Sequence, residues 1–446
     1  MTLVQHQQIE KYAEADQLPK TWSMSRIGDV ASLVQYGLNV RGEPEGKYGI
    51  LRMNCQEEGR VVMRDLRFVN LDPVTAASYR VNRGDLLFNR TNSYELVGRT
   101  AIMDEDTDVV FASYLVRVVV DRQCLDPRFL NFFLNGSEAQ AELKKLAARG
   151  VSQANISAGK LREFIVPVPP LDEQRQIADV LDVARNAIAI EQRAEHVARE
   201  LKRASLDHLF ARGLRTEPQI ETEFGFVPKS WQMVVLDSVA QVQTGVAKGR
   251  KFDSAEMVEV PYLRVANVQD GHLDLSEIKK ISIRSSEISR YRLQSGDVVL
   301  TEGGDFDKLG RGFIWRGELE LCVHQNHVFA VRVNRLKLLP EFFSYLAQSR
   351  YGKAYFLKVA HKTTNLACIN TTKLKSFPAV FPHLDDQREI VDILQSIDQK
   401  IELHKRKRLL LQDLFGSLLH KLMSGHIRVL DLDTSVLPTI SNSQRI

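Results

Sequence analysis

Residues 156–185 read ISAGKLREFIVPVPPLDEQRQIADVLDVAR, and residues 369–398 read INTTKLKSFPAVFPHLDDQREIVDILQSID. The two stretches align without a gap at an offset of 213 residues, and 12 of the 30 aligned positions are identical. That is far more identity than unrelated segments share. The pattern indicates an internal duplication, so a feature of one copy should have a counterpart in the other.

Each stretch predicts the end of a compact domain and the start of a long helix. In the first copy a short apolar run stops at Pro169 and Pro170, because proline fixes φ and removes a backbone donor. Asp172 follows, where it can cap free backbone N–H groups and suits the positive end of a helix dipole. Apolar residues then recur at helical spacing. Asp385 takes the same place after Pro382 in the second copy.

The composition is typical of a globular protein with more than one domain. Of 446 residues, 44% are hydrophobic and 26% charged, and this length exceeds one ordinary core. No apolar run is long enough to span a bilayer, and the polar N-terminal stretch lacks a signal-peptide core, so we expect no membrane partner and a cytoplasmic location. The net charge of +4 permits a nucleic-acid partner without indicating one. The cysteines have neither metal-type nor disulfide-type spacing, which fits a reducing compartment: Cys55, Cys124, Cys322 and Cys368.

The duplication extends over most of the chain. Leu18–Trp22 and Val227–Trp231 open the two copies, each with the pattern Pro-Lys-x-Trp. Strand-like runs follow, from Ile27 to Tyr36 in the first copy and from Leu236 to Thr244 in the second. The leader before Leu18 is polar and rich in glutamine, and it can form at most a short helix.

The middle of each copy predicts turns, strands and then a helix. Gly84-Asp85 and Gly296-Asp297 predict tight turns, since glycine takes positive φ and aspartate bonds to its own nearby backbone. Short apolar runs follow them and predict buried strands at residues 86–88 and 298–300, with further strands ending at 116–118 and 331–333. Pro127 and Pro340 then stand at plausible first helical positions before an apolar stripe.

Both copies end in a helix with coiled-coil periodicity. In the second helix, eight of ten seam positions are apolar: 390, 394, 397, 401, 404, 408, 411, 415, 418 and 422. The polar exceptions are His404 and Arg408. The first helix keeps the seam through Ile177, Leu181, Ala184 and Ile188, and we expect it then to shift to Ile190, Ala194, Val197, Leu201 and Ala204. If the seams pack together, the second helix runs antiparallel to the first, and the chain returns to its N-terminal domain.

The predicted fold class is α+β, with two tandem homologous domains separated by two long antiparallel coiled-coil helices and related by a pseudo-twofold axis. We call the two domains the first head and the second head. The predicted boundaries are 1–170 for the first head, 171–212 for the first helix, 213–383 for the second head with a linker at 213–226, 384–425 for the second helix, and 426–446 for a C-terminal tail.

Catalytic signatures are missing from the sequence. It contains no P-loop, no Gly-x-Ser-x-Gly, no His-Glu-x-x-His, and no Asn/Asp-Pro-Pro-aromatic tetrad of the kind that amino-methyltransferases use. Gly303–Asp305 is glycine-rich without a following helical pattern, which favours a flexible loop over a phosphate cradle. His324 and His327 have metal-like spacing, but the first copy has no counterpart of this pair, so a metal site is not expected. The chain is therefore interpreted as a binding protein.

These residues, in this order, resemble the specificity subunit of type I restriction–modification systems. The resemblance covers nearly the whole chain. It rests on the paired Pro-Lys-x-Trp openings, the paired Pro-x-Leu-Asp-x-Gln-Arg-x-Ile helix starts, and Gly-His-Ile-Arg-Val at Gly425–Val429. In that family each head is a target-recognition domain that reads half of a bipartite DNA site. The helices are a spacer that sets the half-site distance and docks two modification (methyltransferase) subunits.

The resemblance also implies partners and cofactors. We expect double-stranded DNA and two modification subunits as partners, with restriction (motor and nuclease) subunits in the full complex. The family's AdoMet, ATP and Mg belong to these partner subunits, so no cofactor and no catalytic residue is expected on this chain. The missing catalytic motifs agree with that expectation.

Segments that differ between the heads should carry specificity, because shared residues are expected to be structural. Residues 89–94 and 149–153 correspond to 301–306 and 362–366, and Arg, Asn and Gln are the side chains that read guanine and adenine edges. The candidate DNA-binding residues are Asn89, Arg90, Asn92, Arg99, Arg149, Ser152, Gln153, Thr301, Arg311, Lys362, Thr363, Thr364 and Asn365.

Each candidate has a plainer alternative. Arg90 and Asn92 either read bases or are simply solvated. Arg149 and Lys362 are better suited to phosphate contacts, which fix register without reading sequence. The shared pair Arg99 and Arg311 forms either phosphate contacts or structural ion pairs.

Three further features have simpler explanations than DNA binding. The basic run at 404–408 is better explained as a solvated or partner-docking face of the coiled coil than as a nucleic-acid patch. The pairs Tyr79/Tyr291 and Phe164/Phe377 are most simply core residues. Two other functions are weighed: a duplicated coiled-coil interaction protein without DNA specificity, and a nuclease or methyltransferase that acts alone.

Overall fold

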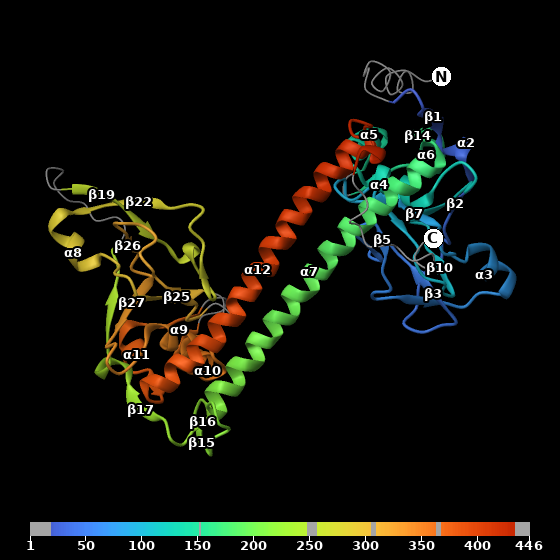
Figure 1. The fold of residues 1–446 in the computed structure, drawn as a ribbon. Coiled ribbons are helices and arrows are strands. Elements are labelled where there is room, and N and C mark those ends of the chain that lie inside the picture. The colour runs from blue at the N-terminus through green and yellow to red at the C-terminus, as the bar shows by residue number, and fades with distance from the viewer. Residues whose placement is uncertain (1–18, 151–152, 248–256, 305–308, 363–366, 433–446) are drawn as a thin grey trace. The chain divides into compact units, whose positions relative to one another are not determined.

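The computed structural model describes residues 19–150, 153–247, 257–304, 309–362 and 367–432 (Figure 1). Contacts divide the chain into two compact units, residues 1–192 with 406–446 and residues 193–405. Each long helix contributes one part to each unit, so the unit boundaries differ from the predicted domain boundaries, which separate the helices from the heads.

The first unit is an α+β domain. Its strands are β1 Ser23–Arg26, β2 Ala31–Tyr36, β3 Tyr48–Leu51, β4 Gln56–Glu57, β5 Arg60–Val61, β6 Arg67–Val69, β7 Leu86–Asn89, β8 Thr91–Asn92, β9 Thr100–Ile102, β10 Val109–Phe111, β11 Leu115–Val120, β12 Ala148–Arg149, β13 Ala154–Asn155 and β14 Ile165–Val168. Its helices are α2 Ile27–Val30, α3 Pro73–Tyr79, α4 Pro127–Asn135, α5 Ser137–Leu146 and α6 Ala158–Arg162, together with the start of α7 Leu171–Arg212 and the end of α12 Leu384–Met423.

The second unit has the same plan. Its strands are β15 Gln219–Thr222, β16 Gly225–Pro228, β17 Gln232–Val235, β18 Ala240–Thr244, β19 Met257–Leu263, β20 Val268–Gln269, β21 His272–Leu273, β22 Lys279–Arg284, β23 Val298–Thr301, β24 Gly303–Gly304, β25 Gly312–Ile314, β26 Val323–His324, β27 Val328–Val333, β28 His361–Lys362, β29 Ala367–Cys368 and β30 Pro378–Phe381. Its α-helices are α8 Ile288–Tyr291, α9 Pro340–Gln348, α10 Arg350–Val359 and α11 Thr371–Lys375, with the remaining parts of α7 and α12.

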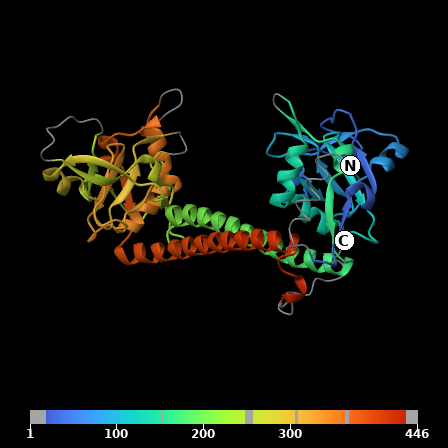
Figure 2. The same cartoon turned by 90° about the horizontal axis from the view of Figure 1, so that it is seen from above.

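Sheet topology confirms the duplication. The order β2-β11-β7-β9 in the first unit matches β18-β27-β23-β25 in the second. The sheets β10-β3-β6 and β12-β13-β8 match β26-β19-β22 and β28-β29-β24, and the pair β1-β14 matches β17-β30. Within each unit, α7 and α12 run side by side in opposite directions (Figure 1, Figure 2). The predicted fold class, duplicated α+β domains with two long antiparallel helices, is therefore confirmed.

One predicted strand-like run is wrong in part. Residues Ile27–Val30 form the short helix α2 rather than a strand, and the corresponding Leu236–Ser238 forms a 3₁₀ turn. Both segments link two strands that belong to different sheets, β1 to β2 and β17 to β18. The chain has to change direction there, and Ile27 and Leu236 are fully buried at these corners, so tertiary packing overrides their strand propensity.

A buried glutamine explains the shared helix start. Gln174 is fully buried at the first turn of α7. Its Nε2 donates to the carbonyls of Cys124 and Pro169 at 2.9 and 2.8 Å, and its Oε1 accepts from the N–H of Asp126 at 2.8 Å. The side-chain amide thus fastens the helix to the segment that leads into α4.

The second copy repeats this arrangement. Gln387, also fully buried, donates to the carbonyls of Lys337 and Pro382 at 2.9 Å and accepts from the N–H of Leu339 at 2.8 Å. The glutamine of the repeated motif therefore satisfies three backbone groups in each unit, which a hydrophobic residue could not do.

The seam of α7 corrects the predicted register shift. The three large apolar residues assigned to the shifted seam are exposed: Ile190 is 66% exposed, Val197 57% and Leu201 50%. The buried and half-buried positions continue unshifted at 177, 181, 184, 188, 191, 195, 198, 202, 205 and 209, which lie 213 residues before the seam of α12. Lys202 sits in this seam and pairs with Asp398 at 2.7 Å. Packing against α12 sets the register, and polar seam residues are tolerated because they find partners.

The described residues that follow α12 pack on the first unit, as predicted. The guanidinium of Arg428 donates to the carboxylate of Glu173 on α7 at 2.7 and 2.9 Å, and Trp22 donates to the same carboxylate at 3.2 Å. Val429 is buried in the core of the first head. The Gly425–Val429 segment therefore closes the first unit.

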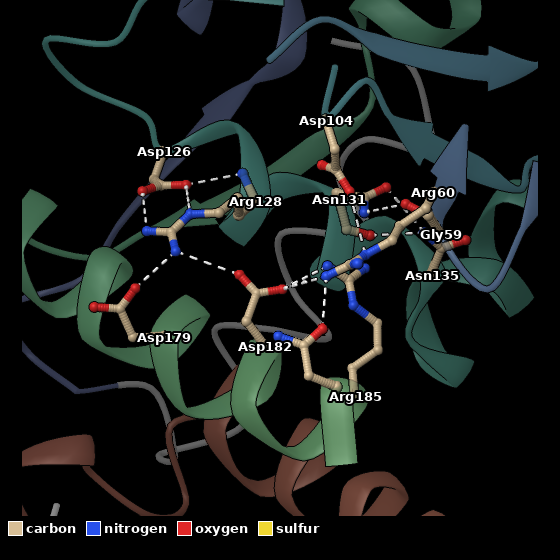
Figure 3. Close-up of polar contacts among 11 residues, drawn as sticks. Gly59, Arg60, Asp104, Asp126, Arg128, Asn131, Asn135, Asp179, Asp182 and Arg185 are labelled. Atoms are coloured by element: carbon tan, nitrogen blue, oxygen red, sulfur yellow. Dashed lines mark hydrogen bonds and ion pairs between the residues drawn. The ribbon is translucent and has the colours of Figure 1, made fainter. Parts of the chain in front are cut away.

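A buried charge network fastens the first head to α7 (Figure 3). Arg128 on α4 pairs with Asp126, Asp179 and Asp182 at 3.1, 2.6 and 3.3 Å. Although burial alone would lower it, the neighbouring Asp126 and Asp179 raise the pKa of Arg128 above its usual value. Asp182 also accepts from Arg185 at 2.5 Å. The network therefore joins α4 to the long helix α7.

Candidate nucleic-acid interface

The structure brings together the loops that sequence comparison selected. In the first head, β8 pairs with β13 and β13 pairs with β12, so Thr91–Asn92 lies beside Ala154–Asn155, which in turn lies beside Ala148–Arg149. In the second head, β24 pairs with β29 and β29 with β28 in the same way. Each head therefore carries a small three-stranded sheet in which two segments that differ between the copies meet.

Two of the candidates are buried. Asn89 is 2% exposed and Thr301 is 1% exposed, and they occupy equivalent ends of β7 and β23. Neither side chain is presented to solvent in this structure. Each residue is the last of its strand, and the variable loop follows directly after it.

Arg90 holds the loops of the first head together. Its guanidinium donates to the carbonyl of Ser113 at 3.1 Å and to Oδ1 of Asn155 at 3.2 Å, and it lies over the ring of Tyr36 at 4.8 Å. Asn92 accepts from the N–H of Ser93 at 2.8 Å. These contacts give Arg90 a clear structural role, and base reading by either residue stays a prediction.

The other described candidates differ in how far their side chains are exposed and whether they are hydrogen-bonded. Gln153 and Arg99 are exposed. Arg311, the counterpart of Arg99, is half-buried and donates to Oε1 of Gln269 at 3.1 Å. Arg149 and Lys362 lie on the paired strands β12 and β28, but their side chains fall outside the described part of the chain. The remaining candidates lie outside the described residues altogether: Ser152, Thr363, Thr364 and Asn365.

The histidine pair of the second head does not form a metal site. His324 is fully buried, with Nδ1 2.6 Å from the carbonyl of Val328, whereas His327 is exposed with Nδ1 2.5 Å from Oε2 of Glu302. Within the described ranges, no group of three or more histidine, cysteine or acidic residues is placed to hold a metal ion. Gly303-Gly304 is the short strand β24, not a phosphate cradle.

The two heads share a backbone framework and differ in the side chains it carries. The N–H of Arg90 donates to the carbonyl of Tyr114 at 3.0 Å, and the carbonyl of Arg90 accepts from Ile156 at 2.9 Å. In the second head Glu302 bonds in the same way to His327 and Ile369, at 2.9 and 2.8 Å. One framework thus presents a cation in the first head and a carboxylate in the second.

The sequence matches the family described as "Type I restriction modification DNA specificity domain" over residues 19–198 and 228–412. The two matched segments coincide with the two copies of the duplication. The chain belongs to this family.

Relatives of this specificity subunit agree in length as well as in sequence. It is 22% identical to the putative type I restriction enzyme MjaX specificity subunit of Methanocaldococcus jannaschii, over 94% of this chain and 96% of the relative. It is 24% identical to the type I restriction enzyme EcoKI specificity subunit of Escherichia coli K12, over 84% of this chain and 82% of the relative.

The fold is also that of solved relatives. The S subunit of a type I restriction–modification system from M. genitalium superposes with a TM-score of 0.58 at 16% identity, and the match covers 91% of this chain and 96% of that one. In the specificity subunit described here, no helix among the described residues is long and apolar enough to cross a membrane.

Each long helix of this specificity subunit carries an exposed apolar stripe, and on α7 its residues are ones that were predicted to lie in the seam. The three stripe residues of α7 are separated by seven and four positions, and those of α12 stand 213 positions later with the same spacing. The stripe residues are Ile190, Val197 and Leu201 on α7, and Leu403, Leu410 and Leu414 on α12. Each exposes half or more of its side chain. Exposed apolar residues in a row, repeated by duplication, are typical of a surface that another protein covers.

Proposed function

We propose that this specificity subunit gives a type I restriction–modification enzyme its DNA sequence specificity, with each head binding one half of an asymmetric bipartite site in double-stranded DNA. The observation that carries the proposal is the shared framework with different side chains. Membership of the family supports DNA as the target, and the duplication provides one head for each half-site.

The asymmetry of the site follows from the chemistry of the variable positions. Arg90 and Glu302 occupy equivalent places, as do Tyr114 and His327. A guanidinium donates hydrogen bonds and a carboxylate accepts them, so the two heads suit different base edges. Identical half-sites would require matching donors and acceptors, which these positions lack.

The long helices set the half-site separation and dock two modification subunits in this proposal. Support comes from the repeated apolar stripes on α7 and α12, since two equivalent surfaces suit two copies of one partner. Restriction subunits join in the full complex. AdoMet, ATP and Mg are assigned to these partners, and this chain contributes recognition without catalysis.

A head exchange tests the proposal. Residues 18–170 are replaced by the equivalent segment of another specificity subunit, and the methylated motif of the reconstituted complex is read. The proposal predicts that one half-site changes and the other is retained. A change in both half-sites contradicts independent heads.

Two controls separate the competing functions. A duplicated interaction protein without DNA specificity would show no salt-dependent DNA binding even with its modification subunits present. A stand-alone enzyme would methylate or cut DNA as the purified chain with AdoMet or Mg, without other subunits. Either result would contradict the proposal.

A further inference from the structure

A cleft of about 600 Å³ opens in the first head outside the loops selected from the sequence. Its polar lining comes from the loop after β2, the end of β3, the start of β6 and the turn between β10 and β11. The residues that matter are Asn39, Arg41, Glu43, Arg52, Arg67 and Tyr114.

The cleft has a rigid floor. The N–H of Leu38 donates to the carbonyl of Phe111 at 2.8 Å, and the carbonyl of Leu38 accepts from the N–H of Ser113 at 2.9 Å. Gly37 lies so close to this turn that a Cβ atom would stand 2.3 Å from the carbonyl oxygen of Ala112. Only glycine permits that approach, so the position where the loop leaves the sheet is fixed.

The outer wall is paired as well. Glu43 and Phe68 exchange two backbone hydrogen bonds at 2.8 and 2.9 Å. Gly42 packs against Arg67 so tightly that an added Cβ would lie 2.5 Å from the Cβ atom of that residue. The loop that carries Arg41 is thereby held beside the strand that carries Arg67.

The charge inside the cleft is dominated by donors. Arg52 is half-buried and donates to the carbonyl of Asp65 at 2.7 Å. Arg41 and Arg67 are exposed, and among the described residues neither has an ion pair or side-chain hydrogen bond. Glu43 is the single carboxylate in the lining, and Asn39 and the 42% exposed Tyr114 complete it. Two free guanidiniums on a fixed frame suit a ligand that presents hydrogen-bond acceptors.

The second head keeps the floor of the cleft and, among its described residues, changes part of the lining. The N–H of Val246 donates to the carbonyl of His324 at 2.7 Å, and the carbonyl of Val246 accepts from Asn326 at 2.9 Å. Arg264 stands where Arg52 stands, and its guanidinium donates to the carbonyl of Glu277 at 3.0 Å. Asn326 and His327 replace Ser113 and Tyr114. The constant floor and variable lining are what a specificity site requires.

We propose that this cleft is a base-reading site of the first head, where Arg41 and Arg67 each donate to the O6 and N7 acceptors of a guanine in the major groove. The inference deepens the proposed function and rests on it. Arginine fits this acceptor pair with two parallel hydrogen bonds from one rigid planar group, a geometry that the single nitrogen of lysine lacks. The first half-site therefore contains guanine.

The test uses the full chain with its modification subunits and DNA fragments in which each base of the wild-type motif is varied in turn. Arg41→Lys and Arg67→Lys keep the charge and replace the planar guanidinium by a single ammonium nitrogen, so each should lower discrimination at one or two positions of one half-site by roughly 10- to 100-fold. The other half-site should be read as before. Arg64→Ala is the matched control, because Arg64 lies in the same head and pairs with Glu57 at the surface.

The outcomes separate base reading from phosphate binding. Uniform weakening across all sequences, with a shallower dependence on salt, would place these arginines on phosphates and overturn the proposal. A bipartite motif read unchanged by both variants would also overturn it while leaving the proposed function intact. A wild-type complex that recognises no bipartite motif would contradict the proposed function itself, and this inference with it.

Discussion

Arg128 of the first head and Asp179 of the long helix α7 are joined by an ion pair 2.6 Å long, in which the arginine side chain is only 4% exposed. The same guanidinium contacts Asp126 and Asp182 (Figure 3). The second head has Glu341 at the position equivalent to Arg128, so it lacks this fastening. The first head is therefore held to its helix by buried charge, which has consequences for stability.

Replacing Arg128 by alanine should destabilise the first unit by about 3–5 kcal/mol, because three carboxylates lose their buried cation. The measurement is urea unfolding of the purified chain followed by circular dichroism, with the expected change a lower midpoint. Arg175→Ala is the control, since Arg175 pairs with the 90% exposed Asp172 and should change stability by less than about 1 kcal/mol. If the two variants lower the free energy of unfolding equally, the buried network contributes no more to stability than an exposed ion pair.

Gln174→Ala should cost about 2–4 kcal/mol, because it leaves the N–H of Asp126 and the carbonyls of Cys124 and Pro169 without their partner. Thermal unfolding of the variant should begin at a lower temperature than that of the wild type. Gln176→Ala, two residues further along the same helix and exposed, should behave as wild type. A Gln174 variant as stable as this control would refute the anchoring role.

Stability of the second head should fall as the pH drops below about 6.5. Burial lowers the pKa of His324 from its usual 6.5, while its bond to Val328 and the nearby Asp297 oppose that shift and Arg332 adds to it. The unfolded chain then binds a proton that the folded chain does not, so acid favours unfolding, with a limiting slope of about 1.4 kcal/mol per pH unit.

His324→Phe checks this prediction, because Phe111 occupies the equivalent position in the first head. Unfolding midpoints of wild type and variant are compared at pH 7.5, 6.5 and 5.5. The variant should lose less stability than the wild type on acidification, whatever its stability at pH 7.5. Parallel curves would mean that His324 does not titrate on unfolding.

The sequence was sufficient for the architecture because the duplication repeats structural residues. Gly84 and Gly296 do adopt positive φ, at 91° and 95°, as their turns require. Phe164 and Phe377 are buried, as predicted for core residues shared by both heads. Gln174 is one of the identical positions of the duplication. Its three backbone partners lie about 5 and 50 residues away, and no local rule identifies them.

The wrong register of α7 and the missed cleft have a common physical cause, since both depend on tertiary packing. Ile190, Val197 and Leu201 are more apolar than the true seam residues, so hydrophobicity alone selected the wrong face of α7. The cleft around Arg41 was missed because its lining comes from four separate segments, and only the fold brings Arg41, Arg67 and Tyr114 together. Comparing loops at matched positions found the variable sheet but could not find this site.

Lengthening both long helices should change the half-site separation without changing what each half-site is. Seven helical residues would be inserted beside Ala198 on α7 and seven beside Ile401 on α12, which pack in one cluster. Each helix then grows by about 10 Å, the length of about three base pairs. Insertion in one helix alone should abolish recognition because the seams fall out of register. An unchanged half-site separation after the paired insertion would show that the length of the helices does not determine it.

The central claim is that this chain supplies the DNA specificity of its complex. The most direct measurement is methylome sequencing of a host that carries the chain with its modification subunit, compared with the same host lacking only this chain. The account predicts an asymmetric bipartite motif that is methylated only when the chain is present. A motif methylated equally in its absence would mean that the modification subunit finds its own target, and would contradict the account.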